Sequence, residues 1–387
     1  MTDRTHFALV FALWGAGLGA AGQYAKISVI FDRLPGVYPD AGNALGFVVS
    51  LVGFVGILLG VVAGLVVARI RYRRAMLWAL WAGAAVSAFQ ATLPALPWML
   101  ASRVVEGVSH LAIVVAAPTL IAGLSAARHR GFTLTLWSTF FSVAFSLLVA
   151  LGLPLVDALG LPALFVAHAA WLAVFAVILT LFLRPLADTG AGAALSLSGI
   201  LSDHLTIYRS PRIAAPGAGW LFYTFCFLAI LTVLPPYIAP AWRAWVMGAM
   251  PLASIAVSLT LGVWLLRYIS AVGLIQMGFA GCIAAMIWLL MMPGLPAACL
   301  ALAGALGLVQ GASFAAVPQL NDGPDTQARA YGALAQTGNL GNTLGTPALL
   351  AVLGVAGYPG LVWTCIVVFA GGAGVHAWMA ARRKALA

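Results

Sequence analysis

Long apolar segments, separated by short polar or Pro/Gly-rich breaks, dominate the sequence. Most are about 20 residues or longer, which is the length that a helix needs to cross a bilayer. Membrane barrel strands would be about half as long and would alternate apolar and polar residues. The pattern therefore predicts twelve transmembrane helices, at residues 7–31, 43–68, 75–95, 97–124, 132–156, 161–183, 214–238, 244–266, 271–292, 296–320, 328–354 and 358–381.

The composition supports the same assignment. Of the 387 residues, 63% are hydrophobic and 7% are charged, and the mean hydropathy is +1.06. Soluble domains carry about 25% charged residues, and a single soluble core stops growing at about 250–300 residues. Because the apolar residues are spread evenly along the chain, we expect an all-α membrane protein whose helices satisfy their own backbone groups in lipid.

The basic residues predict the orientation of the chain. With the N-terminus inside, 15 of the 19 Lys and Arg residues fall in cytoplasmic segments, and the outer loops hold only Arg33 and Arg243. This bias is the one expected of cytoplasmic loops. We therefore expect a multi-pass protein of the cytoplasmic (inner) membrane with both termini in the cytoplasm. The net charge of +10 then suits anionic lipid headgroups, and we expect no nucleic-acid partner.

Motifs for enzymatic chemistry are missing from the sequence. It contains no Gly-x-x-x-x-Gly-Lys-Ser/Thr loop and no His-Glu-x-x-His, which argues against an ATP-driven pump and a zinc hydrolase. The four cysteines lie in or beside predicted spans, so we expect neither disulfides nor a metal site. We thus expect no enzyme and no cofactor; a passive channel and a membrane scaffold remain rival classes.

The twelve predicted spans divide into two groups of six. We expect an N-terminal six-helix bundle at residues 1–183, a central cytoplasmic loop at 184–213 and a C-terminal six-helix bundle at 214–387. The second part of the loop fits either a short amphipathic helix on the membrane surface or an unstructured linker. A Gly and an Arg five residues apart close both the second span (Gly64, Arg69) and the eighth (Gly262, Arg267), which suggests two pseudo-symmetric halves.

The fourth span carries the main candidate site. Arg103, Glu106 and His110 lie on one helical face, because residues three, four and seven apart share a face. Ionisable groups inside a membrane are costly and usually face the interior or a wet cavity. Three interpretations are open: a structural Arg103–Glu106 ion pair, proton coupling through Glu106 or His110, and direct binding of an anionic solute by Arg103.

The first span adds Gln23 and Lys26 as candidate substrate-binding residues. Lys26 lies at a height in the membrane similar to that of Arg103. Its side chain could extend to the outer headgroups. If it faces inward instead, the two cations favour an anionic or zwitterionic solute.

Neutral polar residues are the candidates in the second half, whose spans lack charges. They are Tyr223 in span seven, Gln310 in span ten, and Gln336, Asn339 and Asn342 in span eleven. Gln336, Asn339 and Thr343 share a face. Amides inside membranes also join helices to one another, so both roles stay open. Gly-x-x-x-Gly spacings at Gly15, Gly56 and Gly341 predict close helix contacts.

Together, the twelve spans, the central loop, the basic loop after span two and Arg103-x-x-x-Gly107 resemble the major facilitator superfamily. The family's basic loop reads Gly-x-x-x-Asp-Arg-x-Gly-Arg-Arg; Gly64, Arg69 and Arg73 match it as gating-loop residues, whereas Ala68 replaces the acid and Arg71 replaces the second Gly. The resemblance implies that spans one, four, seven and ten line a central cavity. The stretches around Arg103 and Gln336 are also similar to the cyanate-permease-like branch.

These observations lead to one functional hypothesis. The protein is expected to be a monomeric secondary transporter, coupled to protons, that moves a small anionic or zwitterionic organic solute by alternating access. The alternative is a proton-driven drug or metabolite exporter of the same fold.

Overall fold

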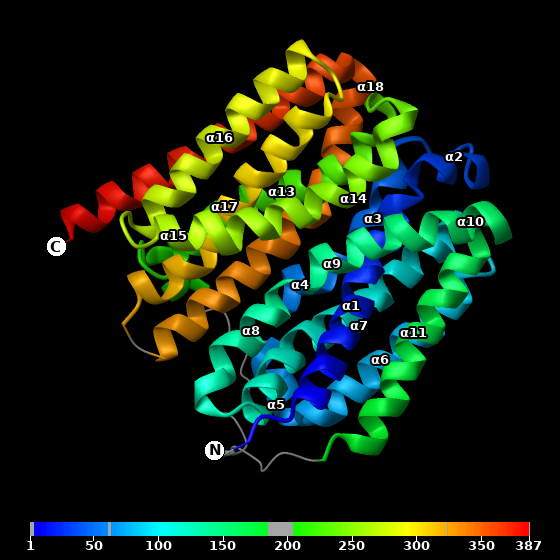
Figure 1. Ribbon diagram of the computed structural model, residues 1–387, viewed down its shortest axis with the longest axis horizontal. Coiled ribbons are helices and arrows are strands. Elements are labelled where there is room, and N and C mark those ends of the chain that lie inside the picture. Colours follow the sequence, from blue (N-terminus) through cyan, green and yellow to red (C-terminus); the bar gives the residue numbers. More distant parts are fainter. Residues whose placement is uncertain (1–3, 61–62, 185–203, 323, 387) are drawn as a thin grey trace. The chain divides into compact units, whose positions relative to one another are not determined.

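The computed structural model describes residues 4–60, 63–184, 204–322 and 324–386, and these are almost entirely helical (Figure 1). Within them, ten helical segments are long and apolar enough to cross a membrane. The last of these, α18 (Pro324–Ala385), is two helices joined at Gly357, whose backbone is not helical. The predicted third span corresponds to α6 (Tyr72–Gln90). The structure therefore agrees with the predicted twelve-helix fold.

Contacts within the chain define two compact units. The first covers Met1–Ala41 and Val62–Leu195, and the second covers Gly42–Val61 and Ser196–Ala387. The predicted division at residues 184–213 stays a prediction, because residues 185–203 lie outside the described part of the chain. Residues 204–209 are helical, within the stretch predicted as a surface helix or a linker.

The first unit is built around α1 (Phe7–Val29). It packs against α7 (Leu96–Leu124), α9 (Phe140–Leu147) and α11 (Leu161–Phe182), while α6 packs against α7 and α11. Most of α1 is buried, including the polar Gln23 and Lys26. The unit also contains η1 (Phe31–Arg33), α2 (Leu34–Val37), α5 (Ala63–Ile70), η4 (Ala127–His129), α8 (Arg130–Ser138), η5 (Leu148–Gly152) and α10 (Leu153–Leu159).

The second unit is organised around α18, which packs along α13 (Ala214–Val233) and α16 (Ala271–Met291). The helix α17 (Pro296–Leu320) lies against α16 and α14 (Pro240–Val257). The remaining elements are η2 (Gly42–Ala44), α3 (Leu45–Ser50), η3 (Leu51–Gly53), α4 (Phe54–Leu59), η6 (Pro235–Tyr237), η7 (Ser258–Gly262) and α15 (Val263–Leu265).

Three of the spans predicted as continuous helices are interrupted. Span two is divided into α3, η3, α4 and α5, a region rich in glycine, which is a poor helix former. Spans five and eight each contain a π-helical turn, η5 and η7. Such turns insert an extra residue into a helix, and hydropathy alone does not reveal them.

The predicted small-residue spacings lie at tight helix contacts. A Cβ atom at Gly15 would meet the ring of Phe175, and one at Gly19 would meet Leu172, so these glycines let α1 approach α11. On α18, a Cβ atom at Gly345 would overlap the backbone carbonyl of Phe225 on α13. Backbone atoms yield less readily than side-chain ends, so the contact between α13 and α18 is the more restrictive one.

The basic loop contains a strained residue. Arg71, which stands where the family's motif has its second Gly, has φ 76° and ψ 126°. A side chain at positive φ is unfavourable, and glycine adopts this region readily. The departure of this sequence from the motif thus places an arginine where the backbone conformation suits glycine.

Gly345→Ala should destabilise the protein by about 1–3 kcal/mol, the usual range for overpacking. Gly354→Ala is the matched control on the same helix, since nothing lies within 4 Å of its added Cβ atom; it should be neutral or slightly stabilising. Thermal unfolding of the two variants in detergent measures the difference. Equal melting temperatures would contradict the contact between α13 and α18.

Arg71→Gly should raise the melting temperature. Removing the strain of a residue in a sparsely populated backbone region should stabilise the folded protein by about 1–3 kcal/mol. The greater conformational freedom of glycine in the unfolded chain offsets about 0.5–1 kcal/mol of this gain. Arg71→Ala is the control, because it removes the charge and keeps the strain. A melting temperature for Arg71→Gly no higher than that of Arg71→Ala would show that the strain is absent.

Candidate functional site

The five residues singled out in spans one and four lie together inside the first unit. Gln23, Lys26, Arg103 and Glu106 have no exposed surface, and His110 is 8% exposed. They come from α1 and α7, which pack side by side. Lys26 therefore faces the interior of its unit and does not extend to the headgroups.

Glu106 is the centre of this cluster. Its Oε1 accepts a hydrogen bond from Lys26 Nζ at 2.7 Å, and its Oε2 accepts from Arg103 Nη1 and, at 2.9 Å, from Gln90 Nε2. Both cations are thus paired with a single carboxylate. Three donors on one carboxylate stabilise its charged form. The prediction that Glu106 or His110 exchanges a proton stays a prediction.

Lys26 has two further polar neighbours. Its Nζ donates to Ser87 Oγ at 2.9 Å and lies 3.3 Å from His168 Nδ1. It also lies over the ring of Phe165, 5.4 Å from the centroid. The ammonium group therefore has an acceptor for each of its three N–H bonds.

Backbone carbonyls determine the tautomers of the two histidines, because a carbonyl oxygen only accepts. His168 Nε2 lies 2.8 Å from Gly19 O and carries the hydrogen, and Nδ1 lies 2.9 Å from Ser87 Oγ and 3.3 Å from Lys26 Nζ, which can only donate to it. His110 Nδ1 lies 3.0 Å from Ala20 O and donates to it. The ring of His110 also packs edge to face with Tyr24.

The amides of the cluster have capacity left for a ligand. Gln23 Nε2 donates to Ser109 Oγ at 2.9 Å, and Gln90 Nε2 also donates to Ser102 Oγ at 3.0 Å. The Oε1 atoms of Gln23 and Gln90 are buried, and among the described residues they have no hydrogen-bond donor. Buried polar atoms without a partner are uncommon, and these two could accept from a hydroxyl or amine.

Three residues of the cluster were not predicted from the sequence: Ser87 and Gln90 of α6, and His168 of α11. Ser87 and Gln90 are three residues apart on one face of span three, and His168 is the only ionisable residue at 161–182. These were usable signals. The sequence does not show which spans pack against α1, and this information is needed to assign the three residues to the cluster.

In the second unit, two candidates contact each other. Tyr223 on α13 donates to Gln310 Oε1 on α17 at 3.2 Å, and Ser254 on α14 donates to the same oxygen at 3.4 Å. Trp220 stacks on Tyr223 with the ring centroids 4.4 Å apart. The predicted polar positions of spans seven and ten are therefore neighbours within this unit.

The candidates on span eleven lie elsewhere, along the broken second span. Gln336 Nε2 donates to Ile57 O at 2.8 Å, and Thr343 donates to Ser50 O at 3.3 Å. Asn339 packs against Gly56, and its Nδ2 donates to Ala335 O at 2.9 Å. These contacts fit the helix-joining role of intramembrane amides. Asn342 is partly exposed on the same helix.

Gln336 also contacts the helical residues 204–209. Tyr208 donates to Gln336 Oε1 at 2.7 Å, and His204 Nε2 lies 3.1 Å from Gln336 Nε2. Burial raises the pKa of Tyr208 to about 12, so its hydroxyl stays protonated and able to donate. The central loop is thereby attached to α18.

The gating role predicted for Gly64, Arg69 and Arg73 stays a prediction. Arg73 donates to the carbonyl oxygens of Leu183 and Thr180 at the end of α11, where a cation is favourable. Arg69 is exposed. Gly64 belongs to α5, but its surroundings lie outside the described residues.

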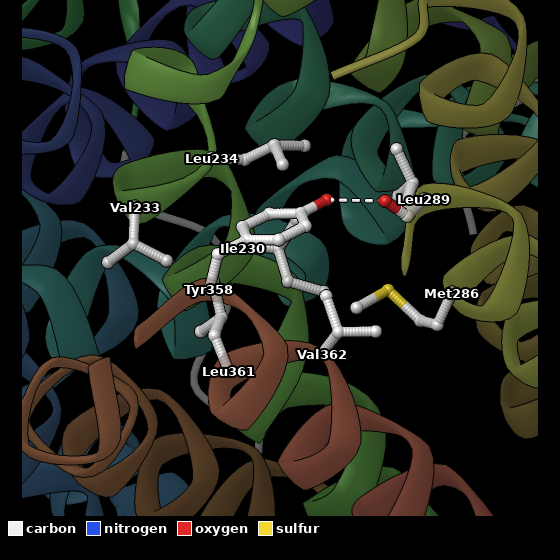
Figure 2. Close-up of a pocket in the computed structure, with 8 residues that line it drawn as sticks. All are labelled: Ile230, Val233, Leu234, Met286, Leu289, Tyr358, Leu361 and Val362. Carbon is white, nitrogen blue, oxygen red and sulfur yellow. Dashed lines mark hydrogen bonds between the residues drawn. The ribbon is translucent and has the colours of Figure 1, made fainter. Parts of the chain in front are cut away.

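A small pocket in the second unit is apolar. Figure 2 shows its eight lining residues, which come from α13 and the residue that follows it, from α16 and from α18: Ile230, Val233, Leu234, Met286, Leu289, Tyr358, Leu361 and Val362. The one hydroxyl, that of Tyr358, donates to Leu289 O at 2.9 Å. The lining therefore offers no free polar group to a charged solute.

Comparison with solved structures shows the fold. The chain is similar to the human organic anion transporter MFSD10 (TETRAN), with 18% identity, a TM-score of 0.71, and coverage of 95% of this chain and 98% of that one. A bacterial homolog of the human lysosomal transporter Spinster gives 13% identity, a TM-score of 0.75, and coverage of 98% and 96%. For the E. coli fucose:proton symporter FucP, the identity is 16% and the TM-score is 0.67, and the match covers 97% of this chain and 99% of that one.

A comparison with curated proteins gives no match. The family model described as Major Facilitator Superfamily, however, matches residues 13–346, which is most of the sequence. The protein, as the resemblance of its motifs suggested, belongs to the major facilitator superfamily and is a membrane transporter, not an enzyme.

Proposed function

We propose that this transporter is a proton-coupled secondary carrier of a small anionic or zwitterionic organic solute, with its site at the buried cluster of the first unit. The observation that carries the proposal is the sharing of one carboxylate, Glu106, by two fully buried cations, Lys26 and Arg103.

If these residues had a purely structural role, they would cost the folded protein free energy that apolar residues would not. Taking charges out of water costs several kcal/mol per ion, and apolar side chains of similar volume often serve stability as well or better. Intramembrane ionisable groups usually mark an ion or substrate path. Donors and acceptors from α1, α6, α7 and α11 all converge on this point.

The chemistry of the cluster supports an anionic group on the solute. A guanidinium binds carboxylates through two parallel hydrogen bonds, and Lys26 adds a second positive charge. The free oxygens of Gln23 and Gln90 suit a donor on the same solute. Of the similar structures, MFSD10 is named as an organic anion transporter and FucP as a proton symporter.

We further propose that the protein works by alternating access as a monomer in the inner membrane, with both termini in the cytoplasm. The distribution of Lys and Arg supports this orientation. The absence of a nucleotide-binding loop in the sequence supports the use of an ion gradient.

Glu106→Gln should destabilise the protein by about 3–5 kcal/mol, because it leaves two buried cations without their counter-ion. Asp157→Asn is the matched control: its ion pair with Arg33 is also 2.7 Å long but exposed, and such pairs are worth about 0–1 kcal/mol. The double variant Lys26→Met/Glu106→Gln should recover part of the loss. Thermal unfolding in detergent measures all three, and equal losses for Glu106→Gln and Asp157→Asn would contradict the coupling.

Arg103→Ala should abolish ligand-induced stabilisation. A ligand at 100 times its Kd stabilises a protein by about 2.7 kcal/mol, so a thermal-shift screen of organic acids and amino acids should reveal one that raises the melting temperature of the wild type. Arg243→Ala, at an arginine that donates to Ile238 O, is the control and should keep the shift. A ligand that still stabilises Arg103→Ala would place the site elsewhere.

A further inference from the structure

The charges of the buried cluster do not balance. Arg103 and Lys26 supply two positive charges when both are protonated, and Glu106 supplies one negative charge. His110 and His168 each donate to a backbone carbonyl through one ring nitrogen, and we take both rings as neutral because burial beside Lys26 and Arg103 disfavours a further positive charge. Among the described residues, one positive charge is therefore uncompensated; Lys26, Arg103 and Glu106 have no exposed surface, and net charge is costly there.

Two events would remove this excess charge: loss of one proton, or arrival of one negative charge. Arg103 stays protonated in proteins. Glu106 already carries its negative charge, held by three donors. Lys26 is therefore the member of the cluster whose deprotonation restores neutrality.

A proton acceptor lies next to Lys26. With Nε2 of His168 donating to Gly19 O, the lone pair of its Nδ1 lies 3.3 Å from Lys26 Nζ and 2.9 Å from Ser87 Oγ, which itself accepts from Lys26 Nζ. Transfer breaks one N–H bond at Nζ, where the electron pair remains, and forms one at Nδ1. The resulting imidazolium can release a proton to water once the site opens, and the cluster is then neutral.

We propose that Lys26 carries the coupled proton and that the transported solute is a monoanion. Protonated Lys26 supplies the positive charge that the monoanion neutralises, and departure of the monoanion favours release of the proton through His168. One proton and one negative charge thus cross together without net movement of charge. This inference rests on the proposed function and differs from the prediction that Glu106 or His110 carries the proton.

Among the described residues, Lys26 has no acidic partner besides Glu106. The elements packed against α1 include α7, α8, α9, α11, η1 and η5; α9 and η5 contain no ionisable residue, α8 begins at Arg130, and η1 contains Arg33 and Asp32, which is exposed. Ser87 and Gln90 of α6 are neutral. The ionisable groups near Lys26 are Arg103, Glu106 and His110 from α7, His168 from α11 and the neutral Tyr24 of α1.

The first test uses the wild-type protein in vesicles that contain a fluorescent pH indicator. Glycolate, lactate and glycerate are the monoanionic probes; lactamide is the neutral control, malate is the dianionic control, and protein-free vesicles report passive entry. At least one monoanion should acidify the lumen above background. Its uptake should be the same when valinomycin and potassium clamp the membrane potential at zero or inside-negative. Uptake that changes with the clamped potential would overturn the one-to-one coupling.

The second test compares two substitutions of Lys26 with Lys384→Arg, a conservative change in the basic C-terminal segment. Lys26→Arg keeps the positive charge and does not release a proton at neutral pH. It should exchange labelled monoanion more slowly than the wild type, while acidification relative to exchange falls by about a hundredfold or more and uptake becomes sensitive to potential. Lys26→Gln should lose exchange as well, and Lys384→Arg should behave like the wild type.

The outcomes separate the two proposals. A wild type that moves none of the probes would overturn the proposed anionic solute and, with it, the role of Lys26. Normal transport in the wild type together with undiminished acidification by Lys26→Arg would overturn the role of Lys26 alone. Should Lys26→Arg fail to fold, as judged by size-exclusion chromatography, His168→Asn takes its place: it removes the proton acceptor beside Lys26, and undiminished acidification by this variant would overturn the proposed proton route.

Discussion

The sharing of one buried carboxylate by two cations is the constraint around which the first unit is organised. Glu106 holds Lys26 of α1 and Arg103 of its own helix, and Gln90 connects α6 to the same oxygen that Arg103 contacts. His168 brings in α11 through Lys26 and Gly19. Four helices are therefore aligned by one polar network in surroundings where apolar packing by itself gives little specificity.

Only part of this network could be predicted from the sequence. The spacing of Arg103, Glu106 and His110 placed them on one face of span four, and the cost of charge in lipid pointed that face inward. The direction of Lys26 was left open, because a lysine near the end of a span can reach the headgroups. Ser87, Gln90 and His168 became recognisable only when α6 and α11 were seen to pack beside α1, which depends on tertiary structure.

The fold was predicted more fully than its local irregularities. The length of the apolar segments predicted the twelve-helix fold, because it follows directly from the thickness of the bilayer. The broken second span and the π-helical turns η5 and η7 were not predicted. The breaks in span two occur in a glycine-rich stretch whose Gly46 and Gly60 lie close to α18, and average hydropathy does not register such contacts.

The hydrogen bond from Gln336 to the carbonyl oxygen of Ile57 has a consequence for how this region tolerates sequence change. A backbone carbonyl is the same whatever side chain its residue bears, so the acceptor survives most replacements at position 57. The donor is more constrained. The Oε1 atom of Gln336 also accepts a hydrogen bond from the Tyr208 hydroxyl. In addition, the Cα atom of Gln336 lies so close to Gly60 that a Cβ atom built on Gly60 would be 3.0 Å away from it. Substitutions should therefore be tolerated at position 57, which supplies only its backbone carbonyl, and be rare at position 336, which supplies its side chain.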